Sequence, residues 1–427
     1  MQSQAKSSNL VSGDSPSRKN KLDGPFISVI IMEPKQPSFF LFSNILSKER
    51  IKWLVPIVHY FDSKIWFTED AVYSIPHLIK EENISNHTRV YFNNKQAIKR
   101  GLALPIGTEL DSLTFIQTYF DALKSSIEIT RVGYLCLTAP YMSNDALFGL
   151  QILEFAEIKN LVPEFYGYLD GIHLLQRGQS PSEFTNVKNA FLKLREEAQK
   201  KFGEFKALFC SRCATARGYM NLPIIEGASI VNLREIICRL KAGVPCLMAD
   251  SIIIANPLYI NSETSELKPE LTNSSKNSQP KNEEDQSENL SENELSPNSP
   301  VEVSIFITHS PYNSEYMFGG LSFGLACANQ GIKTQIIFIE DSTFALMKQN
   351  GAWDFDLHDF DILNVVEALD DTENLSFYCY YPSLRERCLS ESTEVQYNFV
   401  KTIDASQLCE LLNIQNASIK FRNVLFF

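Results

Sequence analysis

The sequence contains no run of 18 or more apolar residues, which argues against a transmembrane helix. Residues 1–24 are rich in Ser, Lys, Asn and Asp and lack the apolar stretch of a signal peptide. We therefore expect a disordered tail over residues 1–24, a cytoplasmic protein and no contact with a membrane.

Positive charge is scarce. The formal net charge is −12, and beyond the N-terminal tail the basic residues gather only weakly, at Lys95, Lys99 and Arg100. An acidic surface repels phosphate backbones. We expect no direct contact with nucleic acid, so that any connection to RNA runs through a protein partner.

The number and spacing of the cysteines do not indicate a disulfide framework. The nine cysteines are odd in number and irregularly spaced in a long chain, which favours reduced thiols. Most should be small buried side chains, and a few could be reactive. We expect no cofactor and no bound metal.

Residues 261–300 are dominated by Ser, Asn, Glu, Pro and Lys, with almost no branched or aromatic residues. Such a segment cannot bury enough apolar surface to offset its ordering entropy. It predicts a disordered acidic linker, which separates a final domain over residues 301–427 from the rest.

Short apolar runs alternate with helical patterns elsewhere. Strands are expected at residues 26–32, 63–67, 130–137, 164–169, 206–209, 303–308, 333–339 and 375–378, and helices at residues 145–158, 186–202 and 319–330. This alternation predicts α/β domains with parallel sheets covered by helices on both faces.

The chain also resembles itself. Residues 140–143 (PYMS) recur as 311–314 (PYNS), Asp170 recurs as Asp341 at the same offset, and Arg217 recurs as Arg387. The first part of the chain shows a weaker similarity to these landmarks, at Asp70 and at the pair Arg100-Gly101. We interpret the chain as three copies of one unit, over residues 25–126, 127–260 and 301–427.

Cys210 is the main candidate for chemistry. Residues 205–219 have the sequence FKALFCSRCATARGY, in which a short strand ends at Cys210 and a helical turn runs to Arg217 and Gly218. Reactive groups collect at the carboxyl ends of parallel strands, and a helix N-terminus with nearby arginines favours a thiolate. The alternative is a small side chain that only fills the strand end.

Cys213 and Arg217 are the candidate helpers. Cys213 completes a Cys-x-x-Cys pair and could be a resolving thiol, half of a zinc site or a packing residue; neither Cys238 nor Cys246 supplies a second pair at zinc spacing. Arg217 could stabilise the thiolate of Cys210.

Asp170 and Tyr141 are expected at the same sheet edge. Asp170 ends a strand and is expected to cap the next helix, or else to orient the loop that carries Gly171 and His173. Tyr141 is expected to fix its loop, with the alternative that it forms a wall of the pocket around Cys210.

The other cysteines are expected to be buried. Cys388 is the counterpart of Gly218. Tyr380 lies eight positions before Cys388 and therefore stands where the second unit has Cys210. Cys379 is therefore one residue out of register and should face the core. The same is expected of Cys136, Cys238, Cys246, Cys327 and Cys409, and the first unit has no cysteine.

These landmarks resemble a known family. Cys210 with Arg217-Gly218, Pro140-Tyr141 and Asp170-Gly171 resembles the DsrE/TusD sulfur carriers. The third unit resembles the DsrF/TusC partner through residues 310–314, 340–341 and 383–387, and the first resembles DsrH/TusB more faintly through residues 69–73 and 99–102. The chain thus resembles a fusion of H-, E- and F-like units.

The resemblance implies flavodoxin-like, doubly wound domains and a sulfurtransferase of the TusBCD or DsrEFH type. Sulfur would be carried as a persulfide on Cys210, received from a donor sulfurtransferase and passed to an acceptor sulfur-carrier protein, for tRNA 2-thiouridine synthesis or for sulfur oxidation. It also implies a homo-oligomer, a dimer of the three-unit chain that imitates a hexamer.

Two other hypotheses compete with the carrier. A non-catalytic DsrE-like assembly module would keep the fold and dispense with the thiol. A dithiol redox protein would use Cys210 and Cys213 as a disulfide pair.

Overall fold

The computed structural model describes residues 35–82, 90–104, 107–259, 299–311, 315–347, 362–369, 371–389 and 399–427. By internal contacts the chain divides into two compact units, residues 1–34 and 35–427, and only the second is described. The predicted tail, the strand expected at residues 26–32 and all of the predicted linker except residues 299–300 lie outside the described residues.

A ten-stranded sheet contains strands from both ends of the chain, in the order β14-β13-β12-β11-β15-β10-β1-β2-β3-β4. Its N-terminal strands are β1 (Pro37–Phe42), β2 (Asp62–Phe67), β3 (Val90–Asn93) and β4 (Thr108–Leu110). Its C-terminal strands are β11 (Val301–Ile307), β12 (Thr334–Phe338), β13 (Leu375–Tyr380), β14 (Val400–Ile403) and β15 (Phe421–Phe426). Within each group the neighbouring strands are parallel.

The middle of the chain forms a second, fully parallel sheet in the order β8-β7-β6-β5-β9. Its strands are β5 (Arg131–Cys136), β6 (Val162–Gly167), β7 (Lys206–Cys210), β8 (Ser229–Val231) and β9 (Cys246–Leu247). The predicted α/β class and parallel sheets are confirmed. A division into three separate domains is not, because the described strands form two sheets.

Strand β10 (Asp250–Ala255) joins the two ends of the chain. It pairs antiparallel with β1 on one side and with β15 on the other. All six of its residues are buried, as expected for a central strand covered on both faces. Residues 127–260 were expected to form one unit, yet β10 lies in the sheet of the other two. The domain boundaries themselves stay a prediction.

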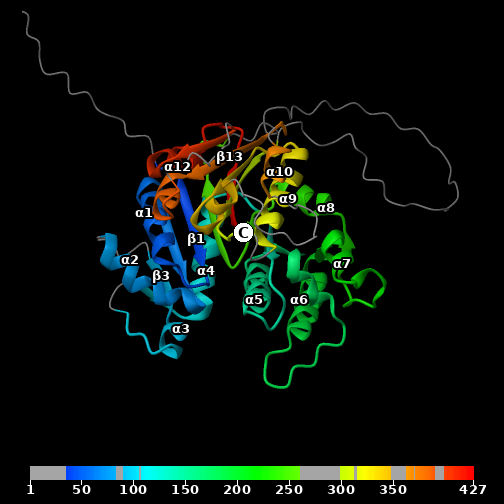
Figure 1. Cartoon of the computed structure of the whole chain (residues 1–427). Helices are drawn as coiled ribbons and strands as arrows, with labels where there is room; N and C mark the ends of the chain where they lie inside the picture. Colours follow the sequence, from blue (N-terminus) through cyan, green and yellow to red (C-terminus); the bar gives the residue numbers. More distant parts are fainter. Residues whose placement is uncertain are drawn as a thin grey trace, which may run out of the picture. The chain divides into compact units, whose positions relative to one another are not determined.

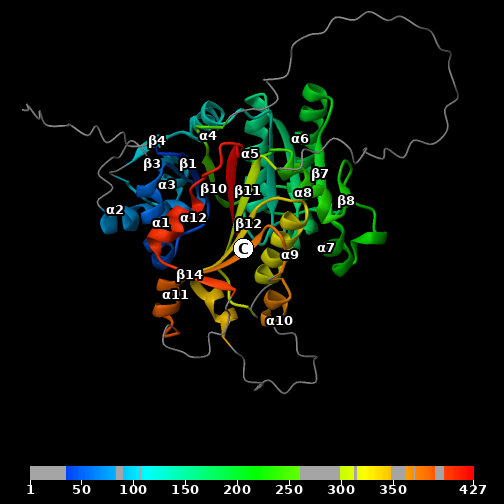
Figure 2. The same ribbon diagram turned by 90° about the horizontal axis from the view of Figure 1, so that it is seen from above.

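Alternate residues along the central strands face two apolar cores. Phe40 and Phe42 of β1 belong to one core with helices α1 (Lys48–Tyr60) and α12 (Ala405–Leu412), whereas Phe39 and Leu41 belong to the other. The second core includes residues of the middle sheet. Figure 1 shows α1 beside α12 at one face of the large sheet, and Figure 2 shows helices α5 to α8 on the opposite side.

The remaining helices cover the sheets. They are α2 (Ile75–Glu82), α3 (Asn94–Lys99), α4 (Ser112–Ser126), α5 (Asp145–Ile158), α6 (Val187–Phe202), α7 (Ser211–Ala216), α8 (Leu233–Lys241), α9 (Tyr316–Asn329), α10 (Ile362–Glu367) and α11 (Tyr381–Glu386). Several begin at side-chain caps typical of helix starts: Asp111, Asn186 and Asn232 accept backbone N–H groups of α4, α6 and α8. In the described part of the chain, none is long and apolar enough to cross a bilayer.

We expect β10 to hold the large sheet together, and Ile253→Ala tests this. Ile253 is fully buried between Phe39 of β1 and Asn423 of β15, so its truncation should lower the free energy of unfolding by about 2–5 kcal/mol. Thermal midpoints measure the loss. Ile230→Ala, in the half-buried edge strand β8, is the control and should cost less; equal losses would contradict a central role for β10.

Candidate functional site

Cys210 is the last residue of β7 and the residue at which α7 begins. Its backbone is extended (φ −61°, ψ 121°), and the short helix that follows ends at Arg217. Gly218 then has φ +76°, a left-handed conformation that glycine adopts without strain. The predicted strand, helical turn and glycine stop are confirmed.

The thiol itself is buried. Cys210 exposes 1% of its surface and Cys213 exposes 7%. The interpretation of Cys210 as a sulfur carrier requires a thiol that a donor can reach, and in this conformation the thiol is not accessible. Any reaction of Cys210 with another molecule therefore requires local opening.

The surroundings nevertheless favour a Cys210 thiolate. A hydrogen bond from the Cys213 thiol is the main cause that lowers the pKa of Cys210 to about 6; burial opposes it, and the backbone N–H groups of Cys213 and Arg212 and the charge of Arg212 add to it. The same pairing, together with burial, raises the pKa of Cys213 well above its usual range. The two thiols thus act as one unit in which Cys213 holds the proton.

Arg217 binds two carboxylates. Its Nε atom donates to Asp170 Oδ1 at 2.7 Å, and its Nη2 atom pairs with Glu315, the residue before α9. The positive charge that lowers the pKa of Cys210 comes from Arg212, while Arg217 acts on Cys213. Arg217 therefore joins two parts of the chain at the edge of the thiol site.

Asp170 does not cap a helix through its side chain. It lies in the first turn of a short 3-10 helix, η3 (Leu169–Leu175), which begins at Tyr168 without a side-chain cap, and its carboxylate accepts from Arg217. The expected cap is wrong, because an arginine from the next strand–helix unit reaches the carboxylate. His173 Nδ1 lies 2.9 Å from the hydroxyl of Tyr219.

Tyr141 fixes a loop, as its predicted structural role requires. It has φ +71°, and its hydroxyl donates to Gln179 Oε1 at 2.8 Å and accepts from the backbone N–H of Val187 at 3.2 Å. The ring also lies 6.4 Å from that of Phe184. These contacts tie the loop after β5 to the loop before α6.

The arrangement around Cys210 occurs three times. In each copy an arginine Nε donates to the Oδ1 of an aspartate in a 3-10 helix, and the residue before that aspartate has positive φ. The pairs are Arg100–Asp70 at 2.8 Å, Arg217–Asp170 at 2.7 Å and Arg387–Asp341 at 3.0 Å, after Glu69, Leu169 and Glu340. The helices are η1 (Glu69–Ser74), η3 and η6 (Glu340–Leu346).

The equivalents of Cys210 follow from this register. Positive φ occurs at Gly101, Gly218 and Cys388, and the residue eight positions earlier is in each case the N-cap of a short helix. Those residues are Asn93, Cys210 and Tyr380. The predicted equivalence of Tyr380 with Cys210 and of Cys388 with Gly218 is confirmed. Residues 312–314 of the repeated Pro-Tyr motif lie outside the described residues.

The other cysteines are mostly in the core, as predicted. Cys379 is buried, and burial raises its pKa to about 12. Cys136, Cys246, Cys327 and Cys409 are buried too, while Cys238 is half-buried and Cys388 is exposed. Over the described ranges, no three His, Cys, Asp or Glu side chains are grouped to hold a metal ion.

Parallel sheets, 3-10 turns and a thiol at a strand end define an α/β protein with a repeated strand–helix unit. Residues 302–421 match the DsrE/DsrF-like family. A crystal structure of the YchN protein from E. coli is similar at 22% identity, over 28% of this chain and 97% of that chain, with a TM-score of 0.24. No curated protein matches the chain. Cys210 lies outside the family match.

The Cys213 thiol should control the acidity of Cys210. Cys213→Ala removes the hydrogen-bond donor, so we expect the pKa of Cys210 to rise from about 6 toward the ordinary value of roughly 8.5. Cys213→Ser keeps a donor and should raise it less. Ultraviolet thiolate absorbance against pH, as the difference from Cys210→Ser, measures the pKa; an unchanged value in Cys213→Ala would refute the pairing.

Proposed function

We propose that this chain is a sulfur carrier of the DsrE-like kind, with Cys210 as the residue that holds the sulfur. The observation that carries the proposal is the position of Cys210, which ends β7 and is the N-cap residue of α7, beside Cys213. There a hydrogen bond from the Cys213 thiol lowers the pKa of Cys210 and favours the thiolate. The sulfur-relay role that the resemblance implies for the DsrE-like family adds general support through the match at residues 302–421.

The step is a thiolate exchange. The Cys210 thiolate attacks the outer sulfur of a donor persulfide, a bond forms between the two sulfur atoms, and the sulfur–sulfur bond of the donor breaks. The donor leaves as a thiolate, while Cys210 keeps the outer sulfur with its proton. No oxidant or reductant is consumed. A donor sulfurtransferase and an acceptor carrier protein are the partners that this chemistry requires.

Residues next to the thiol pair contact helix α9. The hydroxyl of Tyr168 donates to the carbonyl of Gly319 at 3.1 Å, and the side chain of Leu169 packs so closely on Gly319 that a Cβ there would lie 2.8 Å from it. Arg217 and Glu315 pair at the start of the same helix. We infer that loosening this contact gives a donor access to Cys210.

A non-catalytic assembly role is the second candidate, and the burial of Cys210 favours it. The contacts made by the repeated arginines support it too, because they link distant parts of the chain. In that case the thiol would be a packing residue, and its replacement would leave partner binding intact.

Sulfur loading separates the two candidates. Incubated with a small persulfide donor, the full chain should gain the mass of one sulfur atom on the peptide that carries Cys210, and Cys210→Ser should not. Cys388→Ser is the control, since that exposed cysteine has no role in the proposal and its loss should leave the label in place. Label on other cysteines alone, or undiminished label in Cys210→Ser, would favour the assembly role.

Access to Cys210 should depend on Glu315. Glu315→Gln weakens the pair with Arg217, so we expect alkylation of Cys210 to become several-fold faster, measured by mass spectrometry over time. Glu226→Gln breaks another exposed pair, with Arg195, and should leave the rate unchanged. Equal rates in the wild type and Glu315→Gln would show that this contact does not limit access.

A further inference from the structure

Cys213 is placed to react with Cys210, and not only to share a proton with it. Cys210 is the N-cap residue of α7, and Cys213 lies three residues further along in the same short helix. Cα atoms three residues apart in a helix are about 5 Å apart, and a disulfide needs a Cα separation of roughly 4.4–6.8 Å. Both cysteines are free thiols. The backbone therefore already permits a disulfide between them.

The contacts of the two sulfur atoms point the same way. The Cys210 sulfur accepts from the Cys213 thiol and from the backbone N–H groups of Cys213 and Arg212. The backbone N–H of Leu169 is directed at the Cys213 sulfur from the other side. Both cysteine side chains are buried. In the closed conformation Cys213 is therefore a nucleophile that is already next to the sulfur atom of Cys210.

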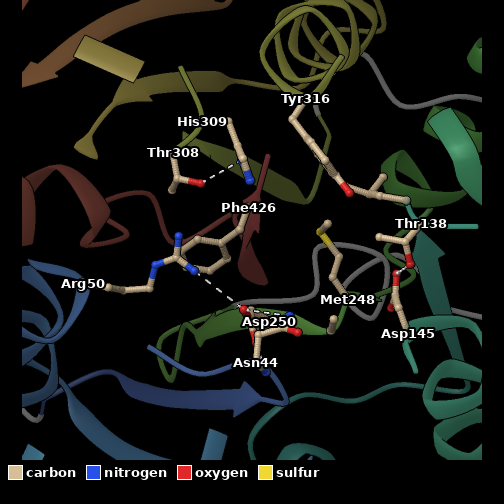
Figure 3. A pocket seen from close by; sticks show the side chains of 12 residues that line it. Asn44, Arg50, Thr138, Asp145, Met248, Asp250, Thr308, His309, Tyr316 and Phe426 are labelled. Atoms are coloured by element: carbon tan, nitrogen blue, oxygen red, sulfur yellow. Dashed lines mark hydrogen bonds and ion pairs between the residues drawn. The ribbon is translucent and has the colours of Figure 1, made fainter. Parts of the chain in front are cut away.

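The cavity of about 290 Å³ in Figure 3 does not lead to this pair. It lies where three other strands end, among residues such as Asn44 after β1, Thr138 after β5 and His309 after β11, and neither thiol lines it. Its charged groups pair with one another, with Arg50 3.7 Å from Asp250. The cavity therefore gives an outside nucleophile no route to the thiols.

Loading of Cys210 changes the surroundings of the Cys213 thiol. The pKa of Cys213 is raised mainly by its hydrogen bond with Cys210, then by burial and by the negative charge of the Cys210 thiolate. The backbone N–H of Leu169 and the charge of Arg217 act in the opposite direction. A neutral persulfide on Cys210 has no thiolate, so the hydrogen bond to a thiolate and its charge are both removed. Cys213 thus becomes a better nucleophile once Cys210 carries sulfur.

We propose that Cys213 discharges sulfur that no acceptor collects: it attacks the persulfide on Cys210, releases the outer sulfur as hydrosulfide and leaves a Cys210–Cys213 disulfide. This regulation rests on the proposed function, because it starts from sulfur carried on Cys210. It limits the time for which the chain stays loaded.

The step needs no outside oxidant. The Cys213 sulfur attacks the inner sulfur, which belongs to Cys210, so a bond forms between the two cysteine sulfurs and the bond from inner to outer sulfur breaks. The outer sulfur leaves as hydrosulfide with its own proton, and the proton of Cys213 passes to water. The outer sulfur is reduced to sulfide while the two cysteines are oxidised to a disulfide. A dithiol reductant returns the pair to free thiols.

The sulfur atom that is attacked decides between transfer and discharge. An acceptor thiolate comes from outside and attacks the outer sulfur, so Cys210 leaves as a thiolate and the sulfur moves on. Cys213 lies inside and reaches the inner sulfur, with the high effective concentration of a neighbouring group. The closed conformation therefore favours discharge, and separation of Leu169 from Gly319 of α9 favours transfer.

The fate of loaded protein tests the proposal. The full chain is loaded with a small persulfide donor, freed of excess donor and kept without an acceptor. By mass spectrometry it should lose the added sulfur and two hydrogens, one sulfide should appear for each sulfur lost, and peptide mapping without reductant should show a Cys210–Cys213 disulfide. Cys213→Ser should lose its sulfur at least about tenfold more slowly, and Cys388→Ser, which lacks the exposed cysteine, at the wild-type rate.

The decay is followed from the loaded state, so slower loading of Cys213→Ser does not affect the comparison. If Cys213→Ser does not fold, Cys213→Ala should retain sulfur in the same way. Equal decay in the wild type and in these variants, or release of sulfide without the Cys210–Cys213 disulfide, would overturn the discharge and leave the carrier function standing. A chain that takes up no sulfur on Cys210 would overturn both.

Discussion

One ion pair, between an arginine after a short helix and an aspartate after the preceding strand, recurs at three places in the described chain. Each arginine also binds a glutamate: Arg100 binds Glu69, Arg217 binds Glu315 and Arg387 binds Glu49. Glu315 precedes α9, Glu49 lies in α1, and Glu69 accepts from Asn144 before α5 at 3.5 Å. Each copy thus contacts the first helix of the next, and the third contacts the first.

The same framework presents a different side chain at each position where chemistry could occur. Asn93 accepts the backbone N–H of Gln96 and caps its helix, Tyr380 is buried with its pKa raised to about 12, and Cys210 has the lowered pKa. The backbone is alike at these three positions, so it does not account for the lowered pKa of Cys210. That pKa is lowered by neighbouring groups that the other two positions lack, chiefly Cys213. The side chains, and not the backbone, distinguish the three positions.

Local signals predicted strands β2, β5, β6, β7, β11, β12 and β13 and helices α5, α6 and α9, since apolar runs and helical periods depend only on nearby residues. They did not predict the other strands and helices of the described chain, β1 and β10 among them. They could not predict that Asp250–Ala255 leaves its own unit, because a short buried strand has the same sequence pattern in either sheet. Asp170 was assigned a cap because its arginine partner lies 47 positions away. The burial of Cys210 was not predicted either, because the accessibility of a strand-end residue depends on tertiary packing that a local pattern does not contain.

Burial and acidity of a thiol normally oppose each other, because desolvation favours the neutral form. At Cys210 the donors outweigh desolvation, so a thiolate is kept away from water in a closed conformation. A persulfide held there would be shielded from small reductants and oxidants, which makes closure useful to a carrier as well as an obstacle to loading. Leu169 and Tyr168 contact Gly319 and Phe323 of α9, and Arg217 pairs with Glu315 at the start of the same helix. The proposed transfer therefore requires that these contacts open before a donor can reach Cys210.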